Sequence, residues 1–304
     1  WAIRQNSDGL MEGIASGFRE PNGIGVFGPD KDIFITDNQG HWTAACKLNH
    51  LRSGRYFGRP SATPDPKNLY NGRDNFTPPA VWFPYTLARS VSGMAEVLDD
   101  RFGPFKGQLL VGDFQNALVV RVFLETINGE YQGAVFPFLN GFRSGVNRLS
   151  YGPDGRLYVG GLQRTWASIA PDPASFERVT FEGKTPFSIL KAEAKTDGFL
   201  LTFTEPVRPS AAATDNFDVS QFSYAYHPDY GSPRFNHAGE KDSQTPIEVT
   251  DVTLSANRLE LRLSLSRWRE GHVTQVKCYD VMSEAGKALW HDTFHYTLNQ
   301  IPRP

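Results

Sequence analysis

Two short segments of this chain carry side chains suited to holding a polar ligand. Residues 37–42, DNQGHW, follow an apolar run and place hydrogen-bonding groups beside an indole ring. Asn38 and Gln39 are candidates for binding a cofactor. His41 and Trp42 are candidates for contacting a substrate, because an aromatic face packs well against the apolar face of a sugar ring. The alternative is a polar turn that satisfies its own backbone.

A similar group ends another apolar run, LLVGDF. Asp113, Gln115 and Asn116 are the weaker counterpart of the first segment and are further candidates for substrate contacts. His41 and His50 are also candidates for a base or a metal ligand, with hydrogen-bonded surface histidines as the alternative. The histidines between residues 227 and 295 show no helical metal-ligand spacing, so the sequence assigns no catalytic residue.

One stretch of the chain occurs twice. Residues 17–35 reappear as residues 141–159 at an offset of 124, with Gly-Phe-Arg and Gly-Pro-Asp shared. Such self-similarity indicates a repeat architecture, and the unit of strand, turn and strand is half a β-propeller blade. Blades span about 40 to 50 residues, so the offset equals two long or three short blades. Arg19 and Arg143 share a position in this repeat, either as cations facing a central funnel or as structural arginines bonded to carbonyls.

The strands that would position these residues follow from apolar runs between turn residues. The expected strands are GIGVF, DIFITDN and CKLNHL in a first blade; QLLVGDF, ALVVRVFLE and YQGAVFPFL in a second; RLSYG, LYVGGL and ERVTFEG in a third. WAIRQ and MEGIASGF, at the start, read as two outer strands of an incomplete blade. A closed propeller needs at least four blades, so we expect the remaining blades upstream or on another chain.

The pattern changes near residue 185. Short alternating strands then follow, as in RLELRLSL, where Leu259, Leu261, Leu263 and Leu265 share one face. This pattern predicts an immunoglobulin-like β-sandwich. The predicted fold class is therefore all-β, with propeller blades over residues 1–184, about three and a half in number, and a sandwich over residues 185–304.

Composition excludes several classes of function. The hydrophobic content of 39% is that of a folded protein, while a net charge of −2 gives no basis for binding nucleic acid. No apolar run approaches the roughly 20 residues that span a bilayer. Cys46 and Cys278, the only cysteines, lie in no CxxC or CxxCH motif, so we expect no haem site in this chain and no disulfide between them.

The segment GFREPNGIGV…DIFITDNQG…YFGRP resembles the soluble sugar dehydrogenases that are six-bladed propellers and bind pyrroloquinoline quinone (PQQ) and calcium. In that family G-x-R-N-P-Q-G is followed by a strand ending in Glu-x-Gly-Pro and later by G-N-Y-G-W-P. The matching residues are Gly17, Arg19, Pro21, Gly23, Gly40, Tyr56, Gly58 and Pro60. A closer likeness is to membrane-bound or haem-linked dehydrogenase propellers of planctomycete-type bacteria. The resemblance covers about residues 1–185.

The resemblance implies roles for individual residues. Arg19 matches the arginine that meets the quinone carboxylates, and Gly40 matches a position whose carbonyl binds calcium, in keeping with the ligands that each group prefers. Asn147-Arg148 stands where the family has an Arg-x-Arg pair, which makes Arg148 a further cofactor-binding candidate. Glu20 replaces a family asparagine, and Gln115-Asn116 stands where a cofactor-binding lysine is expected. The family's histidine base belongs to an earlier blade.

Two functions are therefore expected. The first is a periplasmic or extracellular dehydrogenase-like propeller that oxidises a sugar or related alcohol and passes electrons to a haem partner such as a cytochrome c, with PQQ and calcium as cofactors. The second is a non-catalytic module that binds a glycan or a protein within a larger assembly. Since propellers host many functions, the fold does not choose between them.

Overall fold

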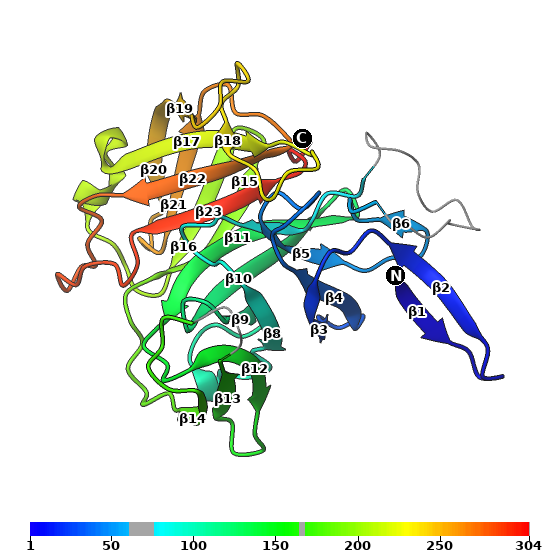
Figure 1. The fold of residues 1–304 in the computed structure, drawn as a ribbon. Coiled ribbons are helices and arrows are strands. Elements are labelled where there is room, and N and C mark those ends of the chain that lie inside the picture. Colours follow the sequence, from blue (N-terminus) through cyan, green and yellow to red (C-terminus); the bar gives the residue numbers. More distant parts are fainter. Residues whose placement is uncertain (61–75, 164–167, 304) are drawn as a thin grey trace.

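The protein is all-β, as the sequence predicts (Figure 1). The computed structural model describes residues 1–60, 76–163 and 168–303. The proline-rich segment of residues 59–80 predicts a long surface loop, and most of it lies outside these residues. Trp166, a further candidate for stacking on a sugar ring, lies outside them as well. The described helices are short 3₁₀ turns, η1 (Asp100–Phe102), η2 (Pro209–Ala212) and η3 (Thr214–Asn216). No helix among the described residues has the length and apolar character needed to cross a bilayer.

Three groups of antiparallel strands correspond to the predicted blades. The first contains β3 (Pro21–Phe27), β4 (Asp32–Asp37), β5 (Cys46–His50) and β7 (Val81–Phe83). The second contains β8 (Val91–Glu96), β9 (Leu109–Asp113), β10 (Leu118–Ile127) and β11 (Glu130–Leu139), and the third β12 (Gly145–Tyr151), β13 (Leu157–Leu162) and β14 (Ala174–Val179). Their first strands β3, β8 and β12 pack side by side, with β8 in the middle. This is the arrangement of neighbouring propeller blades.

Strand β8 was not expected from the sequence because VSGMAE is short and rich in small residues. The structure explains this composition. A Cβ atom at Gly93 would lie 3.1 Å from Cα of Arg148 on β12, and one at Gly25 on β3 would lie 2.7 Å from Cγ of Met94. Small residues therefore allow the three inner strands to approach closely.

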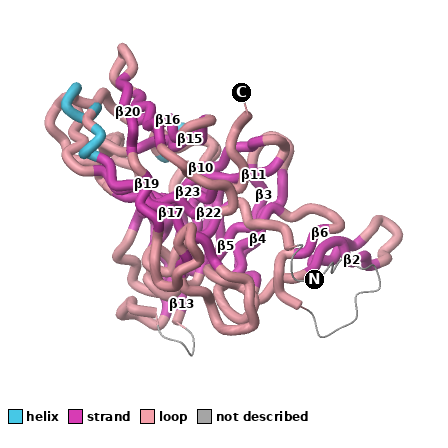
Figure 2. Tube along the Cα trace, turned by 90° about the horizontal axis from the view of Figure 1, so that it is seen from above, coloured by secondary structure: helices cyan, strands magenta, loops and turns pink. Residues whose placement is uncertain are grey.

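The N-terminal strands form a separate small sheet. β1 (Ala2–Gln5) and β2 (Met11–Ser16) make an antiparallel hairpin, and β6 (Arg55–Tyr56) adds to β2 in parallel. Figure 2 shows this sheet standing apart from the body of the molecule. The two leading strands that the sequence predicts are present, and their place as the outer strands of an incomplete blade stays a prediction.

The C-terminal region contains two sheets. One holds β15 (Ile189–Lys195), β16 (Gly198–Phe203), β21 (Glu260–Leu265) and β20 (Val249–Leu254). The other holds β17 (Phe217–Tyr224), β22 (His272–Cys278) and β23 (Thr293–Leu298), with the short β18 (Arg234–Phe235) and β19 (Thr245–Ile247) beside β17. Both sheets contribute side chains to one hydrophobic core, and together they form a β-sandwich. Its immunoglobulin-like topology remains a prediction.

One sheet crosses the predicted boundary at residue 184. Strand β23 pairs with β11, so that Thr297 lies opposite Gly133 and His295 opposite Val135. The sheet therefore continues from the sandwich into the second blade, as the green and red strands of Figure 1 show. The β10–β11 hairpin serves both cores: Phe123 and Phe136 face the sandwich, while Val122 and Val135 face the interior of the blades.

A buried arginine joins the two regions at this hairpin. The Arg121 guanidinium lies 4.1 Å from the ring centroid of Phe136 and donates to the carbonyl oxygens of Ile189 (2.7 Å) and Leu190 (3.0 Å). Burial lowers its pKa to about 9. Both cysteines are free and buried, and burial raises the pKa of each thiol to about 12.

Candidate functional site

A pocket of about 300 Å³ lies at one end of the first two blades, where β3 and β8 begin and β4 and β9 end. Its lining residues are Arg19, Glu20, Asn38, Gln39, Arg89, Ser90, Gln115 and Tyr230. Four residues predicted from the sequence, Arg19, Asn38, Gln39 and Gln115, are thus brought together. They come from the segments just before β3 and just after β4 and β9, and Arg89 and Ser90 come from the segment just before β8.

Two buried aspartates hold the backbone around this pocket. Asp37 accepts the backbone N–H groups of Arg19 at 3.0 Å and of Glu20 at 2.6 Å. Asp113 accepts those of Arg89 and Ser90, each at 2.6 Å. The two aspartates therefore have the same role in neighbouring blades, and each fixes the segment that carries an arginine.

This position changes the interpretation of Asp113, which the sequence indicated as a substrate contact. Its side chain is 0% exposed, and its second oxygen accepts the N–H of Asn116 at 2.6 Å. Burial raises the pKa of Asp113, while its backbone hydrogen bonds oppose that shift. Asp113 therefore anchors the backbone, and neither it nor Asn116 lines the pocket.

Asp37 also has a buried cationic partner. The Nζ atom of Lys47 lies 3.9 Å from Oδ2 of Asp37, and both side chains are buried. Lys47 also donates to the carbonyl oxygen of Phe57 at 2.5 Å. Burial lowers the pKa of Lys47, and the charge of Asp37 counteracts this. The ion pair keeps a carboxylate beneath the Arg19 segment.

Two guanidinium groups reach the pocket. That of Arg19 pairs with Glu20 and lies 5.5 Å from the ring centroid of Tyr230. That of Arg89 lies over the Tyr85 ring at 4.4 Å and forms no salt bridge among the described residues, although the charge of the buried Asp113 attracts it. Arg89 is therefore the cation most available to an anionic ligand. Sequence reasoning missed it because PYTLARS carries no local motif, although its place before β8 matches that of Arg19 before β3.

Arg143, the repeat partner of Arg19, is placed differently. Gly161 stands at the position equivalent to Asp37, so the N–H of Arg143 bonds instead to Glu177 on β14 at 2.9 Å. Its guanidinium pairs with Asp172 at 3.0 Å in an exposed position. Arg143 is a structural arginine, which is one of the two interpretations of the repeat.

Gly40 lies under the Arg19 side chain. A Cβ atom at Gly40 would be 2.2 Å from Nε of Arg19, so only glycine leaves room for it. The Gly40 carbonyl, expected to bind calcium, accepts the N–H groups of Thr43 at 3.0 Å and Gly231 at 3.2 Å. Both of its lone pairs are engaged, so this donor does not fit calcium. The described residues contain no cluster of three or more acidic, histidine or cysteine ligands.

His41 and Trp42 point toward the sandwich, and neither lines the pocket. Nδ1 of His41 lies 2.8 Å from the carbonyl oxygen of Pro228, and the Trp42 ring lies 4.9 Å from the ring of Tyr226. These two predicted substrate contacts therefore pack against the loop of residues 225–233, which connects β17 to β18.

Arg148, predicted to bind the cofactor, is exposed on β12 outside the pocket. Its guanidinium donates to the carbonyl oxygen of Asn147 at 2.7 Å and to the side chain of Asn22 on β3 at 3.1 Å. It bridges the first and third blades across their inner strands. Its role in cofactor binding stays a prediction.

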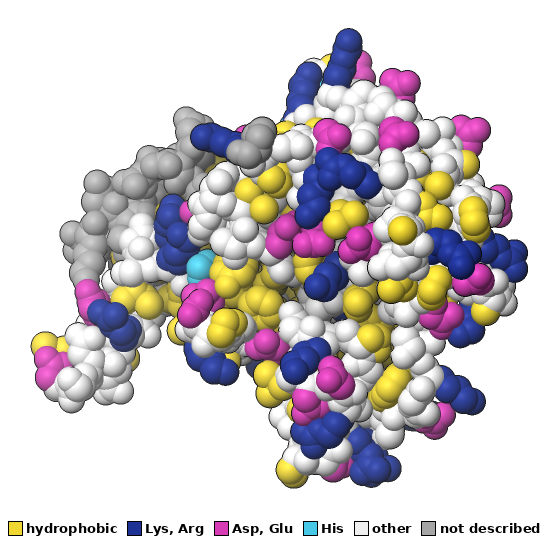
Figure 3. All heavy atoms as spheres, turned by 180° about the vertical axis from the view of Figure 1, so that it is seen from behind, with side chains coloured by type: hydrophobic (Ala, Val, Ile, Leu, Met, Phe, Trp, Pro, Cys, Tyr) yellow, Lys and Arg dark blue, Asp and Glu magenta, His cyan; other side chains and the backbone are white. Residues whose placement is uncertain are grey.

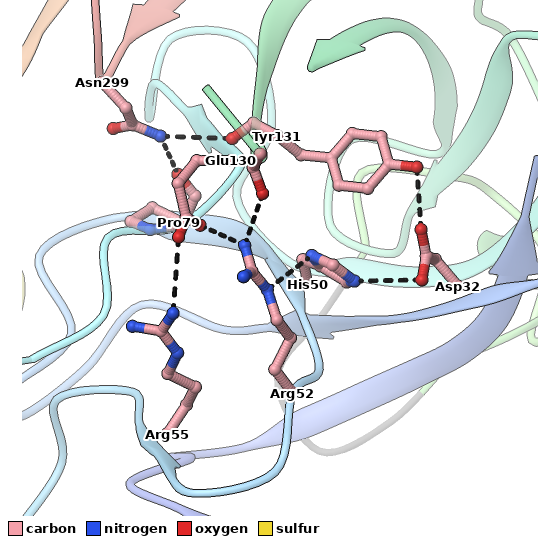
Figure 4. A network of polar contacts seen from close by, with 9 residues as sticks. Asp32, His50, Arg52, Arg55, Pro79, Glu130, Tyr131 and Asn299 are labelled. Carbon is pink, nitrogen blue, oxygen red and sulfur yellow. Dashed lines mark hydrogen bonds and ion pairs between the residues drawn. The ribbon is translucent and has the colours of Figure 1, made fainter. Parts of the chain in front are cut away.

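A second polar cluster surrounds His50 (Figure 4). Nε2 of His50 lies 3.4 Å from Asp32, and its Nδ1 accepts the Nε–H of Arg52 at 3.3 Å. Tyr131 donates to Asp32 at 2.8 Å, and Arg52 also pairs with Glu130. Since both ring nitrogens are engaged and burial lowers its pKa, His50 is a neutral hydrogen-bonded histidine. It joins β4 and β5 of the first blade to the β10–β11 turn.

The family match covers most of the part of the chain that forms the blades. Residues 4–164 match the family model described as Glucose / Sorbosone dehydrogenase. Comparison with curated protein sequences gives no match.

Several solved structures that this chain resembles are dehydrogenases. An oxidoreductase (glucose dehydrogenase) from Thermus thermophilus is 20% identical, with 54% of this chain and 46% of that chain covered and a TM-score of 0.40. The PQQ-bound aldose sugar dehydrogenase from Streptomyces coelicolor is 16% identical, with 54% and 44% covered and a TM-score of 0.37. The soluble aldose sugar dehydrogenase from Escherichia coli is 19% identical, with 48% and 43% covered and a TM-score of 0.35. The chain spans less than half of the length of each.

Proposed function

The chain belongs to the Glucose / Sorbosone dehydrogenase family, and from this premise we propose that it forms part of a sugar dehydrogenase that binds a carboxylated quinone, PQQ, between its first two blades. PQQ would accept two electrons and two protons from a sugar or related alcohol, which becomes a carbonyl compound. The electrons would then pass to a haem partner such as a cytochrome c. We place this chemistry in the periplasm or outside the cell.

One observation carries the proposal. The pocket is lined by two arginines, Arg19 and Arg89, and Arg89 forms no salt bridge among the described residues, although the charge of the buried Asp113 attracts it. Planar guanidinium groups bind carboxylates through paired hydrogen bonds. The amides of Asn38, Gln39 and Gln115 add donors and acceptors for quinone oxygens or hydroxyl groups. A volume of about 300 Å³ is also within the range of small-ligand pockets.

The proposal includes no calcium site, because the Gly40 carbonyl is already engaged by two N–H groups. It also assigns no catalytic base, since the residues lining the pocket include no histidine. We propose that further blades, upstream or on another chain, supply that base. Ile24, Val26 and Ile33 of the first blade support such a neighbour, because their side chains are 70%, 49% and 38% exposed. Figure 3 shows hydrophobic side chains open to solvent on the back of the molecule.

The second candidate is a non-catalytic module that binds a glycan or a protein. The pairing of Arg19 with Glu20 favours it, because this pairing satisfies one of the two cations that a tricarboxylate would need. The Tyr230 ring beside the pocket also suits a sugar face.

Measurements of PQQ binding and of sugar oxidation distinguish the two candidate functions. The full-length protein is titrated with PQQ by calorimetry, and reduction of an artificial dye is followed with glucose and related sugars. A dehydrogenase binds PQQ and reduces the dye only when PQQ and sugar are both present. Binding to a glycan array, with no PQQ binding and no dye reduction, would instead establish the module.

A further inference from the structure

The loop of residues 225–233 in the sandwich lies directly against the segment that forms one side of the pocket. The backbone N–H of Trp42 donates to the carbonyl oxygen of His227 at 3.2 Å, and that of Ser232 donates to the carbonyl oxygen of Ala44 at 2.9 Å. The backbone N–H of Gly231 donates to the carbonyl oxygen of Gly40 at 3.2 Å. These bonds resemble a short strand pairing between the two regions. In Figure 1 this loop, beside β18, lies next to the N-terminal blade strands.

Two glycines make this approach possible. Gly231 has φ of +70°, and a Cβ atom there would lie 2.5 Å from Nε2 of Gln39. On the other side, the lack of a side chain at Gly40 leaves room for the Arg19 side chain. The loop therefore touches one residue that lines the pocket, Gln39, and holds the backbone beneath another, Arg19.

Tyr230 is the residue that this loop delivers to the pocket. Its ring lies 5.5 Å from the Arg19 guanidinium and 5.8 Å from the His41 ring in an edge-on arrangement. The side chain is still 62% exposed, so these contacts leave ring surface open. The pocket thus combines guanidinium groups with an accessible aromatic face.

We infer that the C-terminal region is part of the binding site, and that Tyr230 determines which ligands are accepted by stacking on the planar ring of a carboxylated ligand. This inference rests on the proposed function for its ligand class. The arginines recognise carboxylate groups, whereas Tyr230 recognises a flat ring between them. A carboxylate without a ring therefore gains little from Tyr230.

The test compares two tricarboxylates that differ in the ring. Citrate has no ring, and benzene-1,3,5-tricarboxylate is planar and aromatic. Both are titrated by calorimetry into the full chain and into Tyr230→Ala, Tyr230→Phe and Tyr279→Ala, and PQQ is titrated as a third probe. Tyr279 is the matched control, since it is 42% exposed and its ring lies beside Lys277.

We expect Tyr230→Ala to weaken binding of the aromatic tricarboxylate and of PQQ about tenfold, and binding of citrate less than about threefold. Tyr230→Phe keeps the ring and stays within about twofold of the wild type, as does Tyr279→Ala. Equal affinities of Tyr230→Ala and wild type for the aromatic probe would overturn the inference and leave the proposed function intact. Binding of the aromatic probe that depends on Tyr230, without PQQ binding, would support the inference and reject the function. A wild type that binds none of the three probes would reject both.

Discussion

Lys47 and Asp37 form a buried ion pair beneath the candidate pocket, with Nζ 3.9 Å from Oδ2. The carboxylate of this pair in turn accepts the backbone N–H groups of Arg19 and Glu20. The placement of the half-buried Arg19 thus depends on a charge in the interior. The second blade reaches the same geometry through Asp113 with backbone donors.

Removing the cation of this pair is expected to destabilise the fold. Lys47→Met leaves Asp37 buried without its partner, which costs about 3 to 5 kcal/mol of unfolding free energy. Chemical denaturation followed by fluorescence measures this loss. Lys184→Met, at an exposed position, is the control and should change stability by less than about 0.5 kcal/mol. Equal stability of the two variants would show that the pair is not important for folding.

Arg89→Met is expected to weaken anion binding without unfolding the protein. The guanidinium is exposed and forms no salt bridge among the described residues, so its loss removes a charged hydrogen bond to ligand. This loss corresponds to about a tenfold change in affinity for citrate. Arg143→Met is the matched control, because that guanidinium pairs with Asp172 outside the pocket. The affinities come from calorimetry at fixed ionic strength, since salt screens exposed charges. An unchanged affinity in Arg89→Met would remove the main support for the site.

Gly40→Ala separates binding from stability. The added Cβ would lie 2.2 Å from Nε of Arg19, and this flexible side chain can move away while the backbone stays. We expect the unfolding free energy to change by no more than about 1 kcal/mol. Citrate binding, by contrast, should fall several-fold because Arg19 is displaced.

Gly160→Ala is the control for this substitution, because a Cβ atom there has no neighbour within 4 Å. The two variants are compared by melting temperature and by citrate titration. Citrate affinities that match in both variants would mean that Arg19 does not need its place on Gly40.

His295 is expected to make stability depend on pH. Burial lowers its pKa to about 3, against about 6.5 in the unfolded chain. Between these values the unfolded state binds one proton more, so this group makes the unfolding free energy fall by about 1.4 kcal/mol for each unit of decreasing pH. Denaturation of the wild type and of His295→Gln from pH 7 to pH 4 measures the slopes. A slope that is no shallower in the variant would contradict this account.

Most blade strands could be predicted because they are local. Strand β4 is an apolar run between a Gly-Pro-Asp turn and a polar segment, and its repeat partner β13 follows the same Gly-Pro-Asp turn. Strand β8 could not be predicted, since its small residues are explained only by the neighbours that pack against it. The pairing of β11 with β23 is likewise invisible in the sequence, because it joins positions such as Val135 and His295 that no turn connects.

The candidate site shows the same division. Arg19 and Gln39 could be recognised because they lie in a repeat or in a polar segment that ends a strand. Arg89 and Tyr230 could not, since each belongs to the pocket only through long-range packing. Asp113 is the last residue of β9, whereas His41 and Trp42 lie a few residues beyond the end of β4. Sequence does not show whether such a residue faces a ligand or another part of the chain.

The sheet shared by β11 and β23 has a practical consequence for protein engineering. A cut at residue 184 would not yield two independent modules, because it would separate β11 from β23 and leave an unpaired strand edge on each piece. It would also divide the hydrophobic core of the sandwich, to which β10 and β11 contribute side chains. Fragments made in this way should aggregate, whereas residues 1–304 should melt in one cooperative step. Any graft of this sandwich onto another propeller would have to bring the second blade with it.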